Sequence, residues 1–160
     1  MFRSMSKKIT LREVNAENWE EVVDLELEEE QEDYVASNAY SIAESKFNTY
    51  AVPLAIYAGK KVVGFLMYET LHGEGEPETY SIYRFMIDRR WQGKGYGRRA
   101  LEQTIKDIGR RSDCHRITIC YVPDNEMAKG FYASLGFREV GLNDDGEMVA
   151  EIRLSERTIT

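Results

Sequence analysis

Apolar and polar residues alternate along several short stretches of this chain and recur at helical spacing along others. Alternation at every second position predicts strands at 8–14, 52–58, 62–68, 80–87, 116–121, 137–140 and 148–154. Apolar residues three and four positions apart predict helices at 16–30, 38–47, from the glycine-rich turn 91–97 to 109, and from 125 to 136. The order β-α-α-β-β-β-α-β-α-β-β predicts a mixed α/β fold.

The first predicted helix combines an apolar stripe with an acidic surface. The stripe consists of Trp19, Val22, Val23 and Leu27. On a helical wheel, Glu26 and Glu30 fall at or beside this stripe rather than opposite to it. These two carboxylates therefore border a buried or cleft-like surface, unless the helix ends early.

The last predicted helix carries Met127, Ala128, Phe131, Tyr132 and Leu135 at core spacing.

Length and composition are those of one soluble globular domain: 160 residues, 42% hydrophobic and 31% charged. We expect this domain over 6–155, with 1–5 as an alternative start or an expression remnant and 156–160 as a tail. Two cysteines are too few for a disulfide framework and indicate reduced thiols in a cytoplasmic protein. Neither cysteine has metal-site spacing to other ligands, and the chain has no apolar run of membrane-spanning length. We therefore expect neither a metal nor a membrane partner.

The distribution of charge says more than the net charge of −7, which argues against a general nucleic-acid binder. Residues 17–33 contain ten acids and no bases, whereas residues 89–99 contain five bases and no acids. Two interpretations account for these charge runs. Both can be solvent-exposed faces, or the basic run can bind an anionic cofactor and the acidic run a cationic substrate.

A turn with glycines at every second position, Gly93, Gly95 and Gly97, lies between a predicted strand and a predicted helix. Glycine has no Cβ atom to hold an anion away from the backbone. The first N–H groups of a helix have no internal partner, and the helix dipole adds positive potential there. Three basic residues stand in or beside the turn: Lys94, Arg98 and Arg99. The turn is thus predicted to cradle a pyrophosphate.

Two common phosphate-binding motifs do not fit this turn. A dinucleotide-binding turn requires G-x-G-x-x-G, but Arg98 occupies the last glycine position. A P-loop requires a glycine where Asp88 stands and Ser or Thr where Gly95 stands. What remains is Gln92-x-x-Gly95-x-Gly97.

This segment resembles the acetyl-CoA-binding motif [QR]-x-x-G-x-[GA] of the GNAT superfamily of N-acetyltransferases. The segment Asn125-x-x-Ala128-x-x-Phe131-Tyr132-x-x-Leu135-Gly136-Phe137 resembles the N-x-x-A-x-x-[FL]-Y-x-x-x-G-F segment of the same family. The order of predicted elements extends the match over nearly the whole chain. The resemblance implies a GNAT-like α/β fold, with a mixed, mostly antiparallel central sheet of about six to seven strands flanked by about four helices. It also implies acetyl-CoA as the acyl donor.

The resemblance implies roles for particular residues. Coenzyme A would be bound by Phe85, Met86, Ile87, Gln92, Gly93, Lys94, Gly95, Tyr96, Gly97, Arg98, Asn125 and Ala128. A kink in strand 80–87 would splay it from the next strand, so that Phe85 and Ile87 offer main-chain groups to the pantetheine arm. Tyr132 would protonate the leaving thiolate, because a phenol of pKa about 10 is still protonated at pH 7. From its spacing alone, Tyr132 is equally a half-buried aromatic residue.

The general base stays open, since neither His72 nor His115 is near the motifs. Four acids are candidates both for the general base and for binding of the amine: Glu26, Glu30, Glu76 and Glu78. A water molecule is a further candidate for the base. Cys120 as an acyl-accepting nucleophile competes with Cys120 as a small buried apolar residue.

The acidic segments would attract a multiply charged amine. Residues 63–68, 83–95 and the ending Asp145-Gly146-Glu147 resemble the spermine/spermidine acetyltransferase branch of the family. We therefore expect direct transfer of an acetyl group to a polyamine or diamine. Protein N-termini, ribosomal lysines, amino acids and aminoglycosides remain as alternative acceptors, as does a non-catalytic acyl-CoA-binding module. Family analogy adds a homodimer formed through the last strands.

Overall fold

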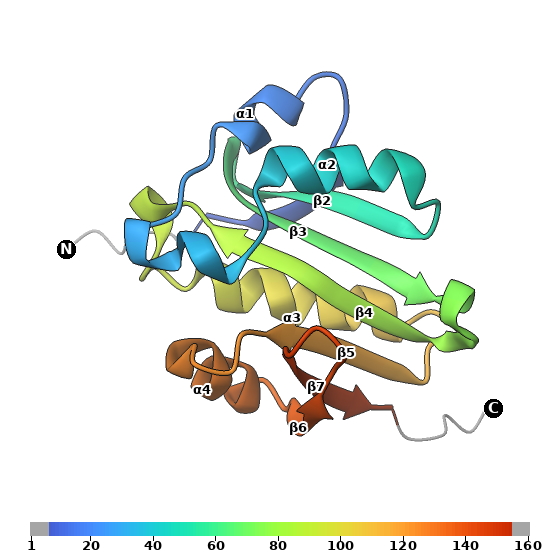
Figure 1. Cartoon of the computed structure of the whole chain (residues 1–160). Coiled ribbons are helices and arrows are strands. Elements are labelled where there is room, and N and C mark those ends of the chain that lie inside the picture. The colour runs from blue at the N-terminus through green and yellow to red at the C-terminus, as the bar shows by residue number, and fades with distance from the viewer. Residues whose placement is uncertain (1–6, 155–160) are drawn as a thin grey trace.

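The computed structural model describes residues 7–154, which form one seven-stranded sheet with helices on both faces (Figure 1). The predicted start 1–5 and tail 156–160 lie outside the described residues. The strands are β1 (Ile9–Glu13), β2 (Ala51–Ala58), β3 (Lys61–Leu71), β4 (Glu76–Ile87), β5 (Arg116–Tyr121), β6 (Arg138–Leu142) and β7 (Met148–Arg153). The α-helices are α1 (Trp19–Val23), α2 (Asn38–Phe47), α3 (Tyr96–Gly109) and α4 (Glu126–Ser134). Short 3-10 helices are η1 (Glu29–Tyr34), η2 (His72–Glu74) and η3 (Arg89–Trp91).

The sheet has the order β1-β2-β3-β4-β5-β7-β6, and β4–β5 is the one parallel pair in the described sheet. The predicted mixed, mostly antiparallel GNAT-like sheet flanked by helices is thereby confirmed. The predicted hairpin is also present, with Gly59 at a φ of 60° in the turn between β2 and β3. That conformation is easy for glycine and costly for other residues.

Two hydrophobic cores lie on opposite faces of the sheet. One packs α3 against the sheet through the predicted stripe that includes Ala100, Leu101 and Ile108. The other packs Val22 of α1 and Ile42 of α2 against the opposite face. Figure 1 shows α1 and α2 on the face turned away from α3. Side chains therefore alternate along each strand between the α3 face and the α2 face.

The predicted helix 16–30 is wrong beyond Val23. α1 ends there, residues 25–28 are not helical, and η1 follows. Tertiary hydrogen bonds hold Glu26 out of a helix: its N–H donates to Asp88 Oδ2 at 2.9 Å, and its carbonyl accepts from the Arg89 N–H at 2.7 Å. A continuous helix would also stack like charges four residues apart, which is unfavourable.

Two residues that the sequence places on apolar stripes are exposed. Trp19, the first residue of α1, is 46% exposed because so short a helix buries little beyond Val22. Met127 is 84% exposed because the first turn of α4 borders a cleft rather than the sheet.

A bulge interrupts β4 at Tyr83. The register with β3 shifts there, because Tyr83 lies between the paired residues Ile82 and Arg84 without a partner of its own. Tyr83 packs into the core on the α2 face, and Arg84 Nε donates to Ser41 Oγ of α2 at 3.2 Å. Two consecutive side chains thus point to one face, and every later side chain of β4 changes sides.

The bulge coincides with the point at which β4 and β5 separate. Their parallel pairing runs from Thr79–Arg116 to Ile82–Ile119, and none follows within the described residues. The kink and splay that the family resemblance implies for this strand are confirmed.

Candidate active site

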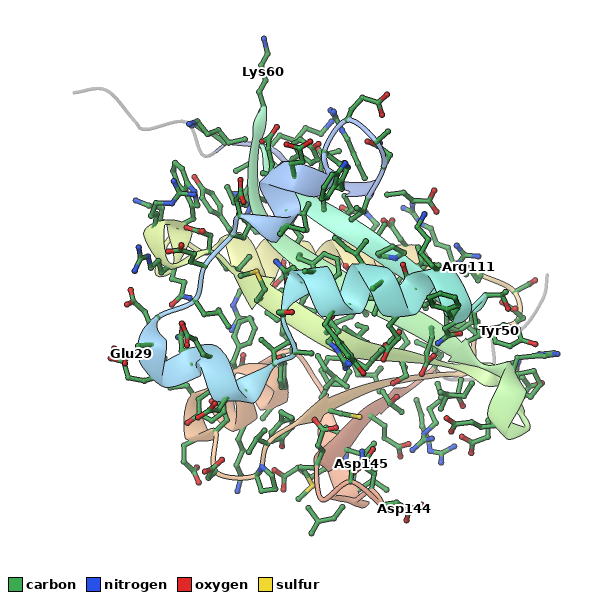
Figure 2. The ribbon with its side chains drawn as sticks, turned by 45° about the horizontal axis from the view of Figure 1, so that its top comes forward. Glu29, Tyr50, Lys60, Arg111, Asp144 and Asp145 are labelled. Carbon is green, nitrogen blue, oxygen red and sulfur yellow. The ribbon has the colours of Figure 1, made fainter. Side chains whose placement is uncertain are left out.

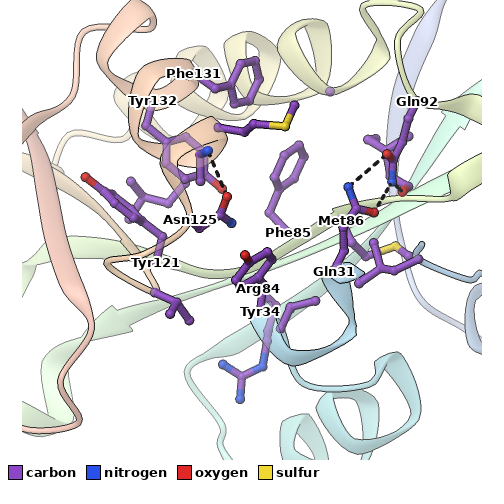
Figure 3. A pocket seen from close by; sticks show the side chains of 18 of the residues that line it. Gln31, Tyr34, Arg84, Phe85, Met86, Gln92, Tyr121, Asn125, Phe131 and Tyr132 are labelled. Atoms are coloured by element: carbon purple, nitrogen blue, oxygen red, sulfur yellow. Dashed lines mark hydrogen bonds between the residues drawn. The ribbon is translucent and has the colours of Figure 1, made fainter. Parts of the chain in front are cut away.

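The gap between the two diverging strands opens into a cleft of about 1120 Å³. The end of β4 and the glycine turn line one side, and α4 lines another. η1 and the junction of β5 with the start of β7 complete the wall. Segments far apart in the sequence therefore meet at one site, as Figure 3 shows.

The glycine turn adopts a backbone that glycine favours. Gly93 and Gly95 have φ angles of 74° and 82°, and a Cβ atom on either would meet no atom within 4 Å. The space around the turn is open, as a ligand-binding loop requires. Gly97 differs, because a Cβ atom there would lie 3.2 Å from the Phe85 ring. Because Gly97 has no Cβ atom, α3 can pack closely on β4.

Helix α3 begins at Tyr96 with its N-terminus at the cleft. Arg99 is the first residue whose N–H bonds back along the helix, to the Gly95 carbonyl at 3.2 Å. Among the residues that the structure describes, the N–H groups of Tyr96, Gly97 and Arg98 have no acceptor. The first turn contains no acid. Free donors and the positive end of the dipole make this turn a site for an anion.

The three basic residues of the turn do not converge. Arg98 lines the cleft, stacks over the Phe131 ring at 5.3 Å and donates to Ser134 Oγ at 2.5 Å. Lys94 is exposed and does not line the cleft, and Arg99 turns away to the Lys7 carbonyl.

Gln92 links the glycine turn by hydrogen bonds to the end of β4 and to η1. Its Nε2 donates to the Ile87 carbonyl at the end of β4 and to Gln31 Oε1 of η1, both at 2.9 Å, and Gln31 Nε2 donates in return at 3.2 Å (Figure 3). The amide pair joins the glycine turn to the acidic segment.

Helix α4 carries the second motif. Asn125 is its N-cap, and its side chain accepts the Ala128 N–H at 3.2 Å. Asn125, Ala128 and Tyr132 all line the cleft. Phe131 stacks with Phe85 of β4, with ring centroids 6.4 Å apart, and so bridges the split (Figure 3).

Tyr132 is 8% exposed and packs among aromatic rings, with the Tyr121 ring 5.5 Å and the Phe137 ring 6.1 Å away. No side chain among the described residues hydrogen-bonds its hydroxyl. The fully buried polar side-chain atom without a partner in residues 7–154 is instead the Tyr83 hydroxyl. Burial is the main cause that raises the pKa of Tyr132, and nearby Tyr121 and Cys120 raise it further. Tyr132 therefore holds its proton at neutral pH while facing the cleft.

Cys120 also lines the cleft, at the end of β5. Burial raises the pKa of its thiol to about 11, and the charge of Glu147 adds to that effect. A protonated thiol is a poor nucleophile, so this environment does not favour Cys120 as an acyl acceptor.

The four acids suggested by the sequence lie in different places. Glu30 lines the cleft. Glu26 pairs with Arg89 at 2.9 Å and does not line it. Glu76 and Glu78 lie at the opposite end of β4 from the cleft, where Glu78 is 4.0 Å from His115.

Other cleft residues were missing from the sequence-based set: Glu28, Asp33, Tyr34, Tyr83, Glu126 and Glu147. Figure 3 shows Tyr34 reaching into the cleft from η1. The acidic run 17–33 pointed to the first two of these residues, Glu28 and Asp33, but Glu147 carried no signal beyond the Asp-Gly-Glu ending. Among residues 7–154, no three metal-ligating side chains form a cluster, and no helix is long and apolar enough to cross a membrane.

The sequence matches the model of the Acetyltransferase (GNAT) family over residues 12–137. The chain therefore belongs to this family and is a GNAT-type N-acetyltransferase. It is 29% identical over 150 residues to a spermine/spermidine N(1)-acetyltransferase of Bacillus subtilis, which covers 90% of this chain and 99% of the relative. The N-alpha-acetyltransferase RimI of Mycobacterium tuberculosis is 32% identical, over 53% of this chain and 51% of its own length.

Solved structures share the fold. The aminoglycoside acetyltransferase AAC(6')-Ib with acetyl-CoA superposes with a TM-score of 0.77 at 17% identity, covering 95% of this chain and 98% of that one. The PaiA N-acetyltransferase from Thermoplasma acidophilum with coenzyme A has a TM-score of 0.66 at 17% identity, covering 92% and 99%.

Proposed function

We propose that the protein transfers an acetyl group from acetyl-CoA to a primary amine of a polyamine or diamine such as spermidine or spermine. One observation carries the proposal. A single cleft has free helix N–H groups at one side, an acidic segment at another and the Tyr132 hydroxyl between them.

The residues of the glycine turn fit the diphosphate of coenzyme A. The turn offers open space at Gly93 and Gly95, free N–H groups at the start of α3, and the Arg98 guanidinium at the cleft. The unpaired edge of β4, which carries Phe85 and Ile87, fits an amide-containing arm, because backbone groups without a strand partner need hydrogen bonds. The bound donor would supply an activated acetyl thioester.

Tyr132 would act as general acid. Its hydroxyl is protonated and has no competing hydrogen-bond partner among the described residues, so it can give its proton to the departing sulfur. The water-poor surroundings also favour neutralising a thiolate rather than releasing it charged.

The acidic wall supports a polycationic acceptor. The N-cap of η1, Glu28, and two residues within η1, Glu30 and Asp33, place three carboxylates at the cleft. They would attract ammonium groups by long-range steering and bind them through charge-assisted hydrogen bonds. The Bacillus subtilis relative, whose name states spermine and spermidine as its substrates, aligns with nearly the whole chain.

A panel of acceptors tests the proposal. Thiol release from acetyl-CoA is measured with spermidine, spermine, lysine, an aminoglycoside and an N-terminal peptide in parallel. The proposal requires the highest kcat/KM for a polyamine. A higher value for the peptide would favour protein N-terminal acetylation, for which the partial match to RimI is the supporting observation. Coenzyme A binding without turnover of any amine would indicate a non-catalytic module.

We also propose a cytoplasmic location, in keeping with a content of two cysteines, which is too low for a disulfide framework, and a homodimer formed through the last strands. β6 is an edge strand with Val140 and Leu142 exposed, and sedimentation equilibrium tests the dimer.

A further inference from the structure

Strand pairing places Glu147 at the junction of the cleft. Tyr121 at the end of β5 pairs with Met148, the first residue of β7, and Cys120 pairs with Val149. Tyr121 and Met148 belong to the core on the α3 face. Because neighbouring side chains alternate, Cys120 and Glu147 point to the opposite face, the same face to which the bulge directs Tyr83 and Arg84.

A tight turn fixes the backbone of Glu147. Its N–H donates to Asn143 Oδ1 at 2.9 Å, and its carbonyl accepts the Asn143 N–H at 2.9 Å. Gly146, with a φ of 78°, completes the turn. The backbone from which the carboxylate extends is therefore fixed, so backbone ordering adds little to the conformational entropy lost when the side chain binds a partner.

The Glu147 side chain lines the cleft, is half-buried and has no ion pair or hydrogen bond among the described residues. It is close enough to Cys120 to act on the thiol electrostatically, and Cys120 in turn acts on Tyr132. Glu147 is therefore a negative charge without a countercharge among the described residues, in the same cleft as Cys120 and Tyr132.

The remaining acids of the cleft have other positions. Glu30 and Asp33 lie on η1, Glu28 is the N-cap of η1, and Glu126 lies at the exposed N-terminus of α4. The wall formed by β5 and β7 contributes Glu147 alone among the cleft acids that the structure describes. The η1 acids are thus suited to the distal ammonium groups of a long amine, and Glu147 to the one that reacts.

We propose that Glu147 is the carboxylate that binds the reacting ammonium group and takes its proton, an assignment that rests on the proposed polyamine acetylation. The nitrogen gives one proton to Glu147 and forms a C–N bond with the acetyl carbon. The C–S bond breaks, the sulfur leaves with the electron pair, and the Tyr132 hydroxyl protonates it. The nitrogen of the new amide gives up its second proton to solvent. Solvent then restores the proton of Tyr132 and removes that of Glu147.

The test is Glu147→Gln, which keeps the shape of the side chain and removes its charge. At pH 7 an alkylammonium of pKa about 10 is almost wholly charged, so the variant is expected to lose about 30-fold to 1000-fold in kcat/KM for spermidine. By pH 9.5 the neutral share of the amine has risen about a hundredfold or more. The ratio of wild-type to variant kcat/KM is therefore expected to fall at least about tenfold between these pH values.

The pH dependence separates this role from a structural one. The groups that face this end of the cleft or act on Cys120 are Cys120, Tyr132, Tyr83, Arg84, Arg116, Glu69 and Glu126. The pKa of Cys120 is raised to about 11 and that of Tyr132 is raised as well, so both stay protonated over this range. A loss that is the same at both pH values would overturn the assignment, as would a variant as active as wild type.

Calorimetry gives a readout that does not depend on turnover. Spermidine should bind the coenzyme A-saturated Glu147→Gln variant about tenfold or more weakly than wild type, while the affinity for coenzyme A stays unchanged. Asp144→Asn is the matched control, because Asp144 lies exposed in the same turn and points to solvent in Figure 2; it should behave as wild type. If wild type acetylates no amine, the proposed function fails, and equal spermidine affinities of wild type and variant would then reject Glu147 separately.

Discussion

At the scale of single residues, burial sets the chemistry of Tyr132 and Cys120. Desolvation is the main cause that raises the pKa of both side chains. Burial therefore makes the cysteine inert and keeps the tyrosine ready to donate a proton. In the proposed mechanism, one apolar environment thus supplies an acid and suppresses a competing nucleophile.

The variant Tyr132→Phe is expected to lower kcat by about ten- to a thousandfold, because it removes the proton donor and keeps the ring packing. Steady-state thiol release measures this effect, and calorimetry should show unchanged coenzyme A affinity. Tyr121→Phe is the control, since the Tyr121 hydroxyl donates to Glu139 rather than facing the cleft chemistry. Equal kcat values for wild type and Tyr132→Phe would remove Tyr132 from the mechanism.

Asp88 is the residue that secures the end of β4. It is 1% exposed and accepts hydrogen bonds from the Glu26 N–H, the Arg90 N–H and the Arg90 side chain. Burial alone would raise its pKa, but the Arg90 side chain and the two backbone donors lower it below the ordinary value. Asp88 therefore couples residues 24–28 to the start of the glycine turn.

Asp88→Asn should lower the free energy of unfolding by about 2–3 kcal/mol, because an amide cannot satisfy three donors as a carboxylate does. Since the folded pKa is depressed, the stabilisation by Asp88 is present above the unfolded pKa of about 3.9 and is lost as pH falls through the folded value. Urea unfolding from pH 6 to pH 3 should show a steeper loss for wild type than for the variant. Parallel curves would refute this role, and Asp107→Asn on the exposed side of α3 is the control.

At the scale of elements, the site consists of ends and interruptions rather than regular structure. The bulge at Tyr83, the separation of β4 from β5 after Ile82 and the free first turn of α3 each leave polar groups without the usual partners. Such groups need a ligand or water to replace those bonds. We therefore propose that the ligands bind at the positions where the sheet and helix patterns break.

Gly95→Ala should weaken coenzyme A binding by at least about tenfold, since a φ of 82° is strained for alanine and the turn must shift. Calorimetric titration with coenzyme A measures this loss. Gly130→Ala is the matched control, because Gly130 lies inside α4 with open space around it. That control should bind normally and gain about 0.5–1 kcal/mol of stability. Undiminished affinity in Gly95→Ala would argue against the turn as the diphosphate site.

The sequence correctly predicted those helices, strands and turns that are determined by residues within the same segment. The hairpin at Gly59, the amphipathic helix α3 and the motif from Asn125 to Phe137 follow from local periodicity and turn chemistry. The extent of the first helix was wrong because Asp88, distant in sequence, takes the Glu26 N–H. Glu147 was missed because only the pairing of β5 with β7 brings it beside Cys120. Local patterns contain no information on such pairings.

At the scale of the whole molecule, a basic segment and an acidic segment meet at the cleft where β4 and β5 separate. The basic turn lies at the N-terminus of α3, and the acidic segment lies on η1; the Gln31–Gln92 amide pair connects them. An anionic donor and a cationic acceptor would thus approach from different segments and meet at Tyr132. Under the proposed function, this arrangement accounts for the acidic run 17–33 and the basic run 89–99 of the sequence.

The most direct test is a crystal structure of the protein with coenzyme A and spermidine. The account predicts the diphosphate on the N–H groups of residues 96–98, the sulfur within about 3–3.5 Å of Tyr132 Oη, and one amine nitrogen beside Glu147. A ligand bound outside the β4–β5 split, or a sulfur remote from the Tyr132 hydroxyl, would contradict it.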